Sequence, residues 1–380
     1  MGMFSGKLPV ALGVQVYQAL VRPILEFAAE VTSITSWPQA EEIQWAMAKR
    51  ILQCRTHTSN IAVMGELGWH SIEARHQQLR VCFWFKIHLM PNHAPTRLVY
   101  EESLRWYSTH AAGDEMIPAV EPEEGWDIMR ASENTAGSNF WCAQLKRDLF
   151  TLGLARYWND PSLIGEKTLL QWKRVVQIAV AKREAARWWR SAQVQPILRT
   201  YVTFKLQPQK LEREAYLDVP HGGWNDRILI GRRALTQLRC GTHGLAIHIG
   251  RYSQTAVEAR FCVFCADGHS IEDERHFFLE CELYADRRQS LWSDVNRIVQ
   301  ESSTRVWNPI PFDATKLTPD QQFTLLTCGP LPVPTGNVCA RRVMSRVLIE
   351  VAERSRIRDE FIDLMERARM TPTSSSTPRV

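Results

Sequence analysis

The sequence predicts a mainly α-helical protein with an N-terminal helical bundle, an acidic linker and a second helical unit that contains a small zinc-braced module. Three observations predict this architecture. Apolar residues recur with helical spacing in several long runs. A stretch rich in carboxylates and poor in apolar residues separates these runs. Three cysteines and a histidine have the spacing of metal ligands. With 380 residues and 45% hydrophobic content, the chain can bury more than one core.

Three apolar runs predict the helices of the first unit, residues 1–110. In the first run Pro23 kinks or restarts the helix, and the apolar residues on one face are Leu12, Val16 and Leu20. The second run begins with Pro38, which suits a first helical turn, and repeats the four-residue spacing at Ile43, Met47 and Ile51. The third run, "LRVCFWFKIHLM", stops at Pro91. We expect these three helices to pack together.

Composition divides the rest of the chain. Residues 111–139 hold seven carboxylates and one arginine, and they offer little apolar surface to offset the entropy of ordering, so we predict an acidic flexible linker. The other predicted stretches are a helical connector with a basic segment at 140–260, a zinc module and following helix at 261–300, a C-terminal helical region at 301–368, and a disordered, low-complexity tail at 369–380.

The main helix of the connector changes character along its length. Its apolar stripe consists of Leu169, Trp172, Val176, Ala179 and Val180. The same face continues with Arg183, Arg187 and Arg190, which we predict as additional contacts to RNA or DNA. We therefore expect the first part of this helix to meet a core. Its last turns, with Trp188 and Trp189 on other faces, are expected to meet solvent or an anion.

One part of the connector, residues 227–257, has a sharper charge pattern than the whole chain, whose net charge is +5. It contains two histidines and no carboxylate, and its five arginines are Arg227, Arg232, Arg233, Arg239 and Arg251. Guanidinium groups match the geometry of phosphates, so this cluster predicts a surface that binds RNA or DNA. The alternative is that several of these arginines pair with carboxylates elsewhere in the fold. Whether the five share an exposed face distinguishes the two interpretations.

The segment "CVFCADGHSIEDERHFFLEC" predicts one structural Zn²⁺ bound by Cys262, Cys265, His276 and Cys281. Two cysteines separated by two residues can share an ion, and Gly268 permits the turn that returns the chain toward the histidine. His269 is a competing ligand, and a pair of reduced cysteines in a small core is the alternative without metal. On an ideal helix residues 276 and 281 lie about 140° apart, so a bent or tightened turn is needed for both to reach one ion.

Other features narrow the class of function. Nine cysteines are scattered along a chain in which we find no export signal, which predicts an intracellular, reducing location rather than a disulfide framework. No apolar stretch is long enough to cross a bilayer, so we expect no membrane partner. Phosphate-loop, nucleophile-elbow and zinc-protease motifs are missing. We therefore predict no enzymatic activity and no small-molecule substrate.

Two blocks of the sequence carry a resemblance to a known family. The first is "VYQALVRPILEFAAEV" followed by "IQWAMAKRILQCRTHTSNIAVMGELGWHSIEARHQQLR", with landmarks at Val21, Arg22, Pro23, Leu25, Glu26, Gln44, Lys49, Leu52 and Glu66–Trp69. The second is "LTQLRCGTHGLAIHIGRY" leading into "FCVFCADGHSIEDERHFFLECELYADRR". Together they resemble the C-terminal region of non-LTR retrotransposon reverse transcriptases, in which a helical thumb is followed by a Cys-Cys-His-Cys zinc module. The blocks cover a little under half of the chain, in the family's order.

The resemblance implies a non-catalytic piece of such a protein. In the family the fingers and palm lie ahead of the first block, whereas here Met1 precedes it by only a few residues. The segment Tyr284–Arg287, "YADR", superficially resembles the Tyr-x-Asp-Asp metal site of reverse transcriptases, but arginine replaces the second carboxylate that a two-metal site needs. The implied function is a zinc-stabilised fragment that binds RNA or DNA. The alternative is a decayed or co-opted structural or protein-interaction module that does not bind nucleic acid.

Overall fold

The protein is mainly helical in the residues that the computed structural model describes, which are 9–33, 36–110, 140–204, 210–221, 226–265, 267–303, 312–328 and 337–370. Within these ranges the only β contact is an isolated antiparallel bridge between Phe261 and Ile271. The predicted mainly α-helical fold is therefore confirmed. The predicted linker 111–139 lies outside the described residues. Most of the predicted tail does too, but residues 369 and 370 belong to the last helix.

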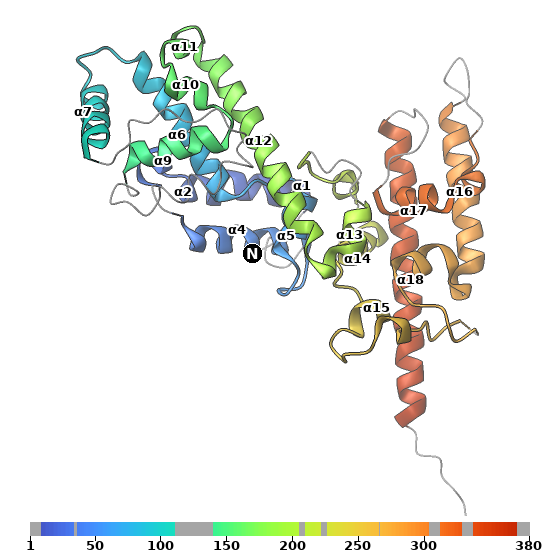
Figure 1. Ribbon diagram of the computed structural model, residues 1–380. Coiled ribbons are helices and arrows are strands. Elements are labelled where there is room, and N and C mark those ends of the chain that lie inside the picture. Colours follow the sequence, from blue (N-terminus) through green and yellow to red (C-terminus); the bar gives the residue numbers. More distant parts are fainter. Residues whose placement is uncertain are drawn as a thin grey trace, which may run out of the picture.

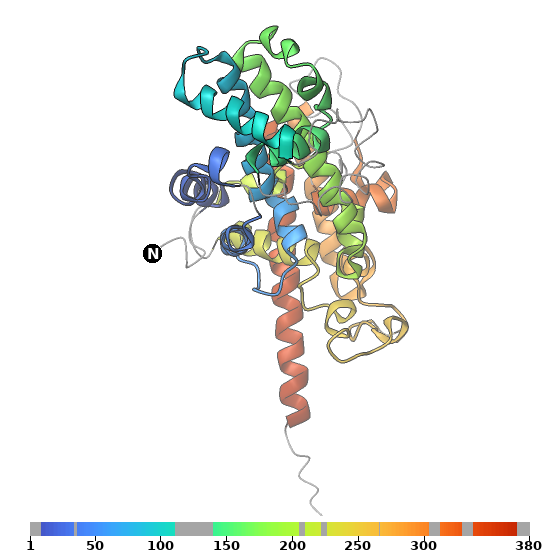
Figure 2. The same ribbon diagram turned by 60° about the vertical axis from the view of Figure 1, so that its left-hand side comes forward.

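Figure 1 shows two groups of helices side by side. The first group consists of α1 (Val10–Val16), α2 (Arg22–Leu25), α3 (Ala29–Thr32), α4 (Pro38–Leu52), α5 (Asn60–Leu67), α6 (Ile72–Leu89), α7 (Pro95–His110), α9 (Trp141–Thr151), α10 (Ala155–Asn159), α11 (Ser162–Gly165) and α12 (Leu169–Gln193). The second group consists of α13 (Arg199–Phe204), α14 (Arg227–Arg239), α15 (Ala246–Ile249), α16 (Ala285–Ser303), α17 (Pro319–Cys328) and α18 (Asn337–Met370). Both views show the last turns of α18 extending beyond the other helices (Figures 1 and 2). None of the described helices has the length and apolar character that a membrane span requires.

The core of the first group is aromatic. Trp84, Phe85 and Trp172 are fully buried between α6 and α12, and the rings of Phe85 and Trp172 stack with their centroids 5.3 Å apart. Two further residues of the predicted α12 stripe, Val176 and Val180, belong to the same core. The prediction that the first part of this helix meets a core is therefore confirmed.

The last turns of α12 meet a second core. Trp188 is only 5% exposed, packs with Tyr201 of α13 and donates from its indole nitrogen to the Ile61 carbonyl at 2.8 Å. The prediction that α12 changes partner is correct. The expectation that Trp188 meets solvent or an anion is wrong, because α13 and the start of α5 cover it.

Two predicted helix faces are shifted. In α1 the buried residues are Val10, Gly13 and Val14, while Leu12 and Leu20 of the predicted face are exposed. Gly13 explains why this face of α1 is the buried one. A Cβ at Gly13 would lie 3.2 Å from Ile51 Cγ1, so the absence of a side chain lets α1 approach α4 closely here. In α4, Met47 and Ile51 are buried as predicted, whereas Ile43 is exposed. The first two predicted helices contact one another, and α4 also contacts α6.

The largest core joins the two groups of helices. It includes Met47 and Leu67 from the first group and Leu235 and Val347 from the second. Within the second group, α14 lies against α18 at Gly231, where an added Cβ would meet the Leu348 carbonyl oxygen at 1.8 Å. This close approach brings α14 against the helix that also supports the metal centre described below.

Replacing Gly231 with alanine is expected to lower the free energy of unfolding by about 3 kcal/mol, because the new methyl group would overlap backbone, which cannot rotate away. Urea denaturation measures the effect. Gly165→Ala is the matched control, since a Cβ at Gly165 meets nothing within 4 Å. That control should change stability by less than about 1 kcal/mol. An equal change in the free energy of unfolding in the two variants would contradict the close α14–α18 contact.

Candidate metal centre and basic surface

The first two cysteines of the candidate metal centre lie in a short hairpin. The Cys262 N–H donates to the Ser270 carbonyl at 2.7 Å, beside the isolated antiparallel bridge. Gly268 has φ 64°, a left-handed conformation that glycine adopts without steric cost. The hairpin turns back at this glycine, as predicted from the sequence. It brings the ligand atoms of Cys262 and Cys265 within 4.8 Å of each other.

The chain beyond the hairpin resolves the angular difficulty between His276 and Cys281. His276–Glu280 (η6) is a π-helical turn, and the Cys281 N–H donates to the His276 carbonyl at 2.8 Å. A hydrogen bond that spans five residues brings residue 281 beneath residue 276, whereas an α-helix would put them on different faces. The expected departure from an ideal helix is present. It is a widened turn rather than a tightened one.

The four predicted ligands converge. Cys265 Sγ lies 3.3 Å from His276 Nε2 and 3.9 Å from Cys281 Sγ. Cys262 Sγ lies 3.9 Å from Cys281 Sγ, and all four ligand atoms lie within 4.8 Å of one another. A tetrahedral ion that binds thiolates at about 2.3 Å separates two sulfur ligands by about 3.8 Å, close to the observed separations. The group could therefore hold a metal ion with little movement of its side chains.

His269, the competing ligand considered from the sequence, is exposed and is not a member of this group. His276 is 2% exposed, and its Nε2 is directed at the cysteines. Its other ring nitrogen, Nδ1, lies 3.6 Å from a carboxylate oxygen of Glu280. A carboxylate behind a histidine ligand is the usual means of fixing ring orientation.

The cluster favours a thiolate before any ion binds. The hydrogen bond from the Cys281 thiol lowers the pKa of Cys262 to about 4, against the opposing effect of burial. Cys262 and Cys281 are 4% and 1% exposed. A buried anionic sulfur needs a cation or hydrogen-bond donors beside it, because low dielectric surroundings penalise an uncompensated charge. A metal ion bound by the four ligands would supply that compensation.

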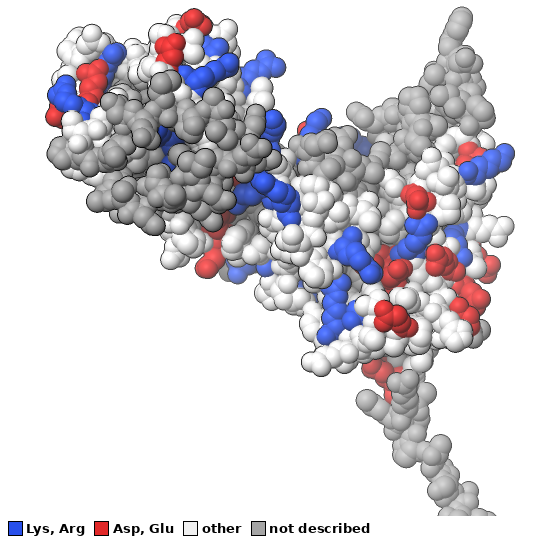
Figure 3. Space-filling view, viewed as in Figure 1, with Lys and Arg blue, Asp and Glu red and all other residues white. Residues whose placement is uncertain are grey.

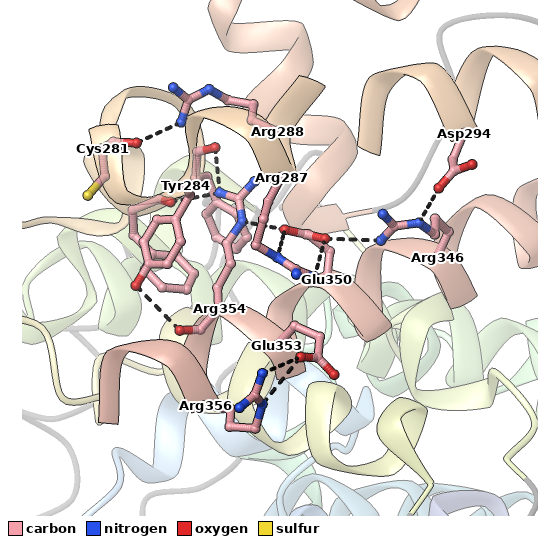
Figure 4. A network of polar contacts seen from close by, with 12 residues as sticks. Cys281, Tyr284, Arg287, Arg288, Asp294, Arg346, Glu350, Glu353, Arg354 and Arg356 are labelled. Atoms are coloured by element: carbon pink, nitrogen blue, oxygen red, sulfur yellow. Dashed lines mark hydrogen bonds and ion pairs between the residues drawn. The ribbon is translucent and has the colours of Figure 1, made fainter. Parts of the chain in front are cut away.

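Helix α18 contacts the segments that carry the metal ligands, and Figure 4 shows the part of this network around Arg354 and Glu350. The fully buried Arg354 donates to the carbonyls of Phe277 and Phe278 at 2.8 and 2.9 Å, within the π-turn that carries His276. Its Nε pairs with Glu350 at 2.9 Å. A second buried pair joins Arg358 to Glu272 in the hairpin through two hydrogen bonds of 2.8 and 2.9 Å. These contacts hold the ligand-bearing segments against one helix.

The "YADR" segment belongs to the same network (Figure 4). Tyr284 is buried, and its hydroxyl donates to the Arg354 carbonyl at 3.3 Å. Arg287 makes two hydrogen bonds to Glu350, at 3.0 and 3.1 Å. Both residues therefore have a structural role that accounts for them.

The three arginines predicted on α12 have different surroundings. Arg183 donates to Gln77 Oε1 at 2.7 Å. Arg187 pairs with Glu184 at 2.9 Å, although 46% of its side chain remains exposed. Arg190 is exposed. Only the last of the three presents its charge to solvent without a partner described for it.

The five arginines of the basic segment do not share one surface, which corrects the expectation that the whole cluster could bind nucleic acid. Arg239 is buried and pairs with Glu66 at 2.9 Å. Arg232 is 3% exposed and donates to the Val219 carbonyl; burial lowers its pKa. Arg227 is exposed but lies 3.3 Å from Glu353. Arg233 is exposed and Arg251 is half-buried. Arg232 and Arg239 are therefore no longer candidates for contacts with nucleic acid.

A different basic surface lies where the two groups of helices meet. We call it the seam surface and define it by Arg55, His57, Arg199, Arg251 and Arg260. A groove of about 730 Å³ is lined by Arg199, Arg251 and Arg260. Burial lowers the pKa of Arg251, and Arg260 and Arg199 lower it further against the opposing effect of Glu274. In Figure 3, Lys and Arg side chains gather over this middle region near α13 and α15.

The sequence identified one member of the seam surface, Arg251, and missed the others. Burial lowers the pKa of His248 to about 4, and the neighbouring His243, Arg251, His57 and Arg55 lower it further, which brings the loop after α4 into the same positive region. Arg260 lies three residues beyond the end of the predicted segment, so a longer window would have included it. No local pattern links Arg55 and His57, in the loop after α4, to Arg199, because Arg199 lies more than 140 positions further along the chain.

Comparisons with protein-family models, with curated proteins and with solved structures found no match to this chain.

Proposed function

We propose that this protein is a non-catalytic, zinc-stabilised module that binds RNA or DNA, corresponding to the C-terminal fragment of a non-LTR retroelement reverse transcriptase. The seam surface carries the proposal. Within the described residues, no carboxylate forms an ion pair with Arg199, Arg251 or Arg260. Guanidinium groups that are gathered without ion-paired carboxylates favour a polyanion, and phosphate is the anion whose geometry they match best.

The donor set supports zinc as the metal. Three thiolates and one imidazole suit Zn²⁺, and four protein ligands complete its tetrahedral shell. With no open position, such an ion stabilises the fold and does not activate water. Carboxylates near the ligands, Asp267, Glu272, Asp273 and Glu280, argue against a phosphate contact at the metal centre itself.

The metal centre also supports the seam surface. The Ile247 N–H donates to the Glu272 carbonyl at 3.1 Å, and the Ala246 N–H donates to the Glu272 side chain at 2.7 Å. Glu272 lies in the metal-bearing segment, while α15 leads directly into Arg251. Loss of the metal should therefore disturb the seam surface as well as the metal centre.

Binding to nucleic acid should weaken strongly with salt. If about four phosphates are neutralised on duplex DNA, the slope of log affinity against log salt is about −3.6, because each contact releases a condensed counterion. Fluorescence anisotropy with labelled RNA and DNA measures this slope. The double variant Arg199→Gln/Arg251→Gln should weaken binding to all sequences and make the slope shallower by about 1.8.

The matched control is Arg297→Gln, since Arg297 is exposed on α16 and already pairs with Asp294 at 2.9 Å. It should bind as wild type does. A flat salt dependence, or no binding at low salt, would favour the interaction-module alternative. Charge reversal at Arg232 is not a suitable test, because that side chain is buried and its replacement would disturb folding.

One observation favours the second candidate, a protein-interaction module. The first helices expose large apolar side chains at Leu20, Ile24 and Phe27, which are 64%, 71% and 83% accessible. Apolar side chains grouped in this way on a surface are typical of contacts with another protein. The two functions are compatible, since this face belongs to the first helices and the seam surface to the junction with the second group.

A further inference from the structure

We infer that the seam surface takes a single-stranded segment of nucleic acid, with one base stacked on Tyr252 and an adjoining phosphate held by Arg251 and Arg199. The inference rests on the proposed function and specifies the strand state that this surface accepts. Three features of the described residues carry it: an exposed aromatic ring, an adjoining groove with cationic and apolar walls, and a loop that is fixed in place.

Tyr252 is the exposed ring. It is 67% accessible, a high value for a tyrosine that also contacts two other rings. His248 and His57 lie nearly perpendicular to it, with centroid distances of 5.3 and 6.4 Å. These neighbours orient the ring while leaving most of its surface in solvent. Every base has a π-face, so an oriented, exposed aromatic side chain is a stacking platform that tolerates any sequence.

The groove is lined by Arg251, the residue before Tyr252 in the chain. The Arg251 Nη1 is buried with no hydrogen-bond partner among the described atoms. Its Nη2 makes only a long contact, 3.5 Å, to the Pro196 carbonyl. The protein therefore leaves donor capacity of the Arg251 guanidinium unused, and the side chain lines the groove, where a phosphate would accept from it. Arg199 is exposed on the same groove.

The remaining wall of the groove is apolar. Val202, Ile247 and Val257 line it together with the arginines. An inorganic anion has no apolar surface to bury against such a wall, whereas a sugar or a base does. In a duplex the bases are stacked inside the helix and cannot reach Tyr252 without being flipped out at an energetic cost. The combination of wall, ring and cations therefore favours a single strand.

Arg260 fixes the loop that presents these groups. Its Nε and Nη2 donate to the Thr255 carbonyl at 3.0 and 2.8 Å, and its Nη1 donates to the Ile247 carbonyl at 2.7 Å. Its side chain also lies against Gly250, where a Cβ would come 2.6 Å from Nε. Most of its donors are engaged within the protein. Arg260 is thus a positioning residue, and the ring and cations are arranged before the ligand arrives.

The test compares labelled oligo(dT) and oligo(U) of about 12 nucleotides with a duplex of the same length, by anisotropy at fixed salt. Wild-type protein should bind the single strands at least about tenfold more tightly than the duplex. Tyr252→Ala should lose about tenfold in affinity for single strands and leave duplex binding unchanged. Tyr252→Phe should behave as wild type, because stacking needs the ring and not the hydroxyl. Far-ultraviolet circular dichroism checks that both variants fold.

The outcomes separate the inference from the proposed function. If Arg199→Gln/Arg251→Gln weakens binding but wild type binds duplex as well as single strands, the strand preference is wrong and the proposed function stands. An unchanged affinity of Tyr252→Ala for single strands would overturn the stacking contact. Absence of binding to every oligonucleotide at low salt would overturn both. Ultraviolet cross-linking of a 5-iodouracil strand to Tyr252, located by mass spectrometry, would support the contact directly.

Discussion

Cys265→Ser and His276→Ala are each expected to abolish stoichiometric metal binding and to unfold the region around the metal centre. The free energy of binding zinc to a structural site is folding free energy, about 10–16 kcal/mol for small zinc modules at neutral pH. Removing one of four ligands forfeits much of it, and the buried thiolates are then left without a cation. Elemental analysis should find about one zinc per chain in the wild type and substoichiometric zinc in both variants. Limited proteolysis should cut their C-terminal third.

His269→Ala is the matched control. His269 lies only seven residues from His276 but is exposed and outside the ligand group, so this variant should keep its zinc and its protease resistance. Addition of a strong chelator to wild-type protein should reproduce the effect of the ligand variants. Stoichiometric zinc in His276→Ala, or none in wild-type protein purified without chelator, would contradict the assignment.

Arg239→Ala is expected to lower the free energy of unfolding by about 3–5 kcal/mol, because it leaves the Glu66 carboxylate buried without its partner. Both side chains are fully buried, and they come from different groups of helices. Arg239 also lies 3.2 Å from Glu214 and donates to the Thr327 carbonyl at 2.6 Å, so one guanidinium joins three segments. Urea denaturation followed by circular dichroism measures the loss.

Arg297→Ala provides the comparison for this second prediction. Arg297 pairs with Asp294 and Glu301, but its side chain is 60% exposed, and exposed ion pairs contribute at most about 1 kcal/mol. The loss in free energy of unfolding in Arg239→Ala, compared with that in Arg297→Ala, isolates the effect of burial on an otherwise similar arginine–carboxylate pair. A loss in Arg239→Ala no larger than that in Arg297→Ala would mean that the interior of the protein near Glu66 is hydrated.

Local patterns in the sequence were sufficient for several features. Trp172, Val176 and Val180 repeat with helical spacing, and they face one core because the period of an α-helix depends only on its backbone. Pro38 begins α4 as expected, since proline lacks the N–H that a first turn leaves unpaired. The ligand group was also predictable. Its members are close in the chain, and a hairpin followed by a helical turn needs few residues to bring them together.

Only the tertiary structure decided which arginines are exposed and able to contact a ligand. Arg239 and Arg233 lie on one helix, yet one is fully buried and the other exposed. Arg239 lies on the face of α14 that packs against the core, and the carboxylate that makes its burial tolerable belongs to Glu66, which is 173 positions away in the chain. The seam surface likewise assembles from segments that share no local pattern. Helical period and ligand spacing are properties of neighbouring residues, so the sequence by itself determined them. The partner of a charge is set by the packing of distant helices, and only the folded chain specifies it.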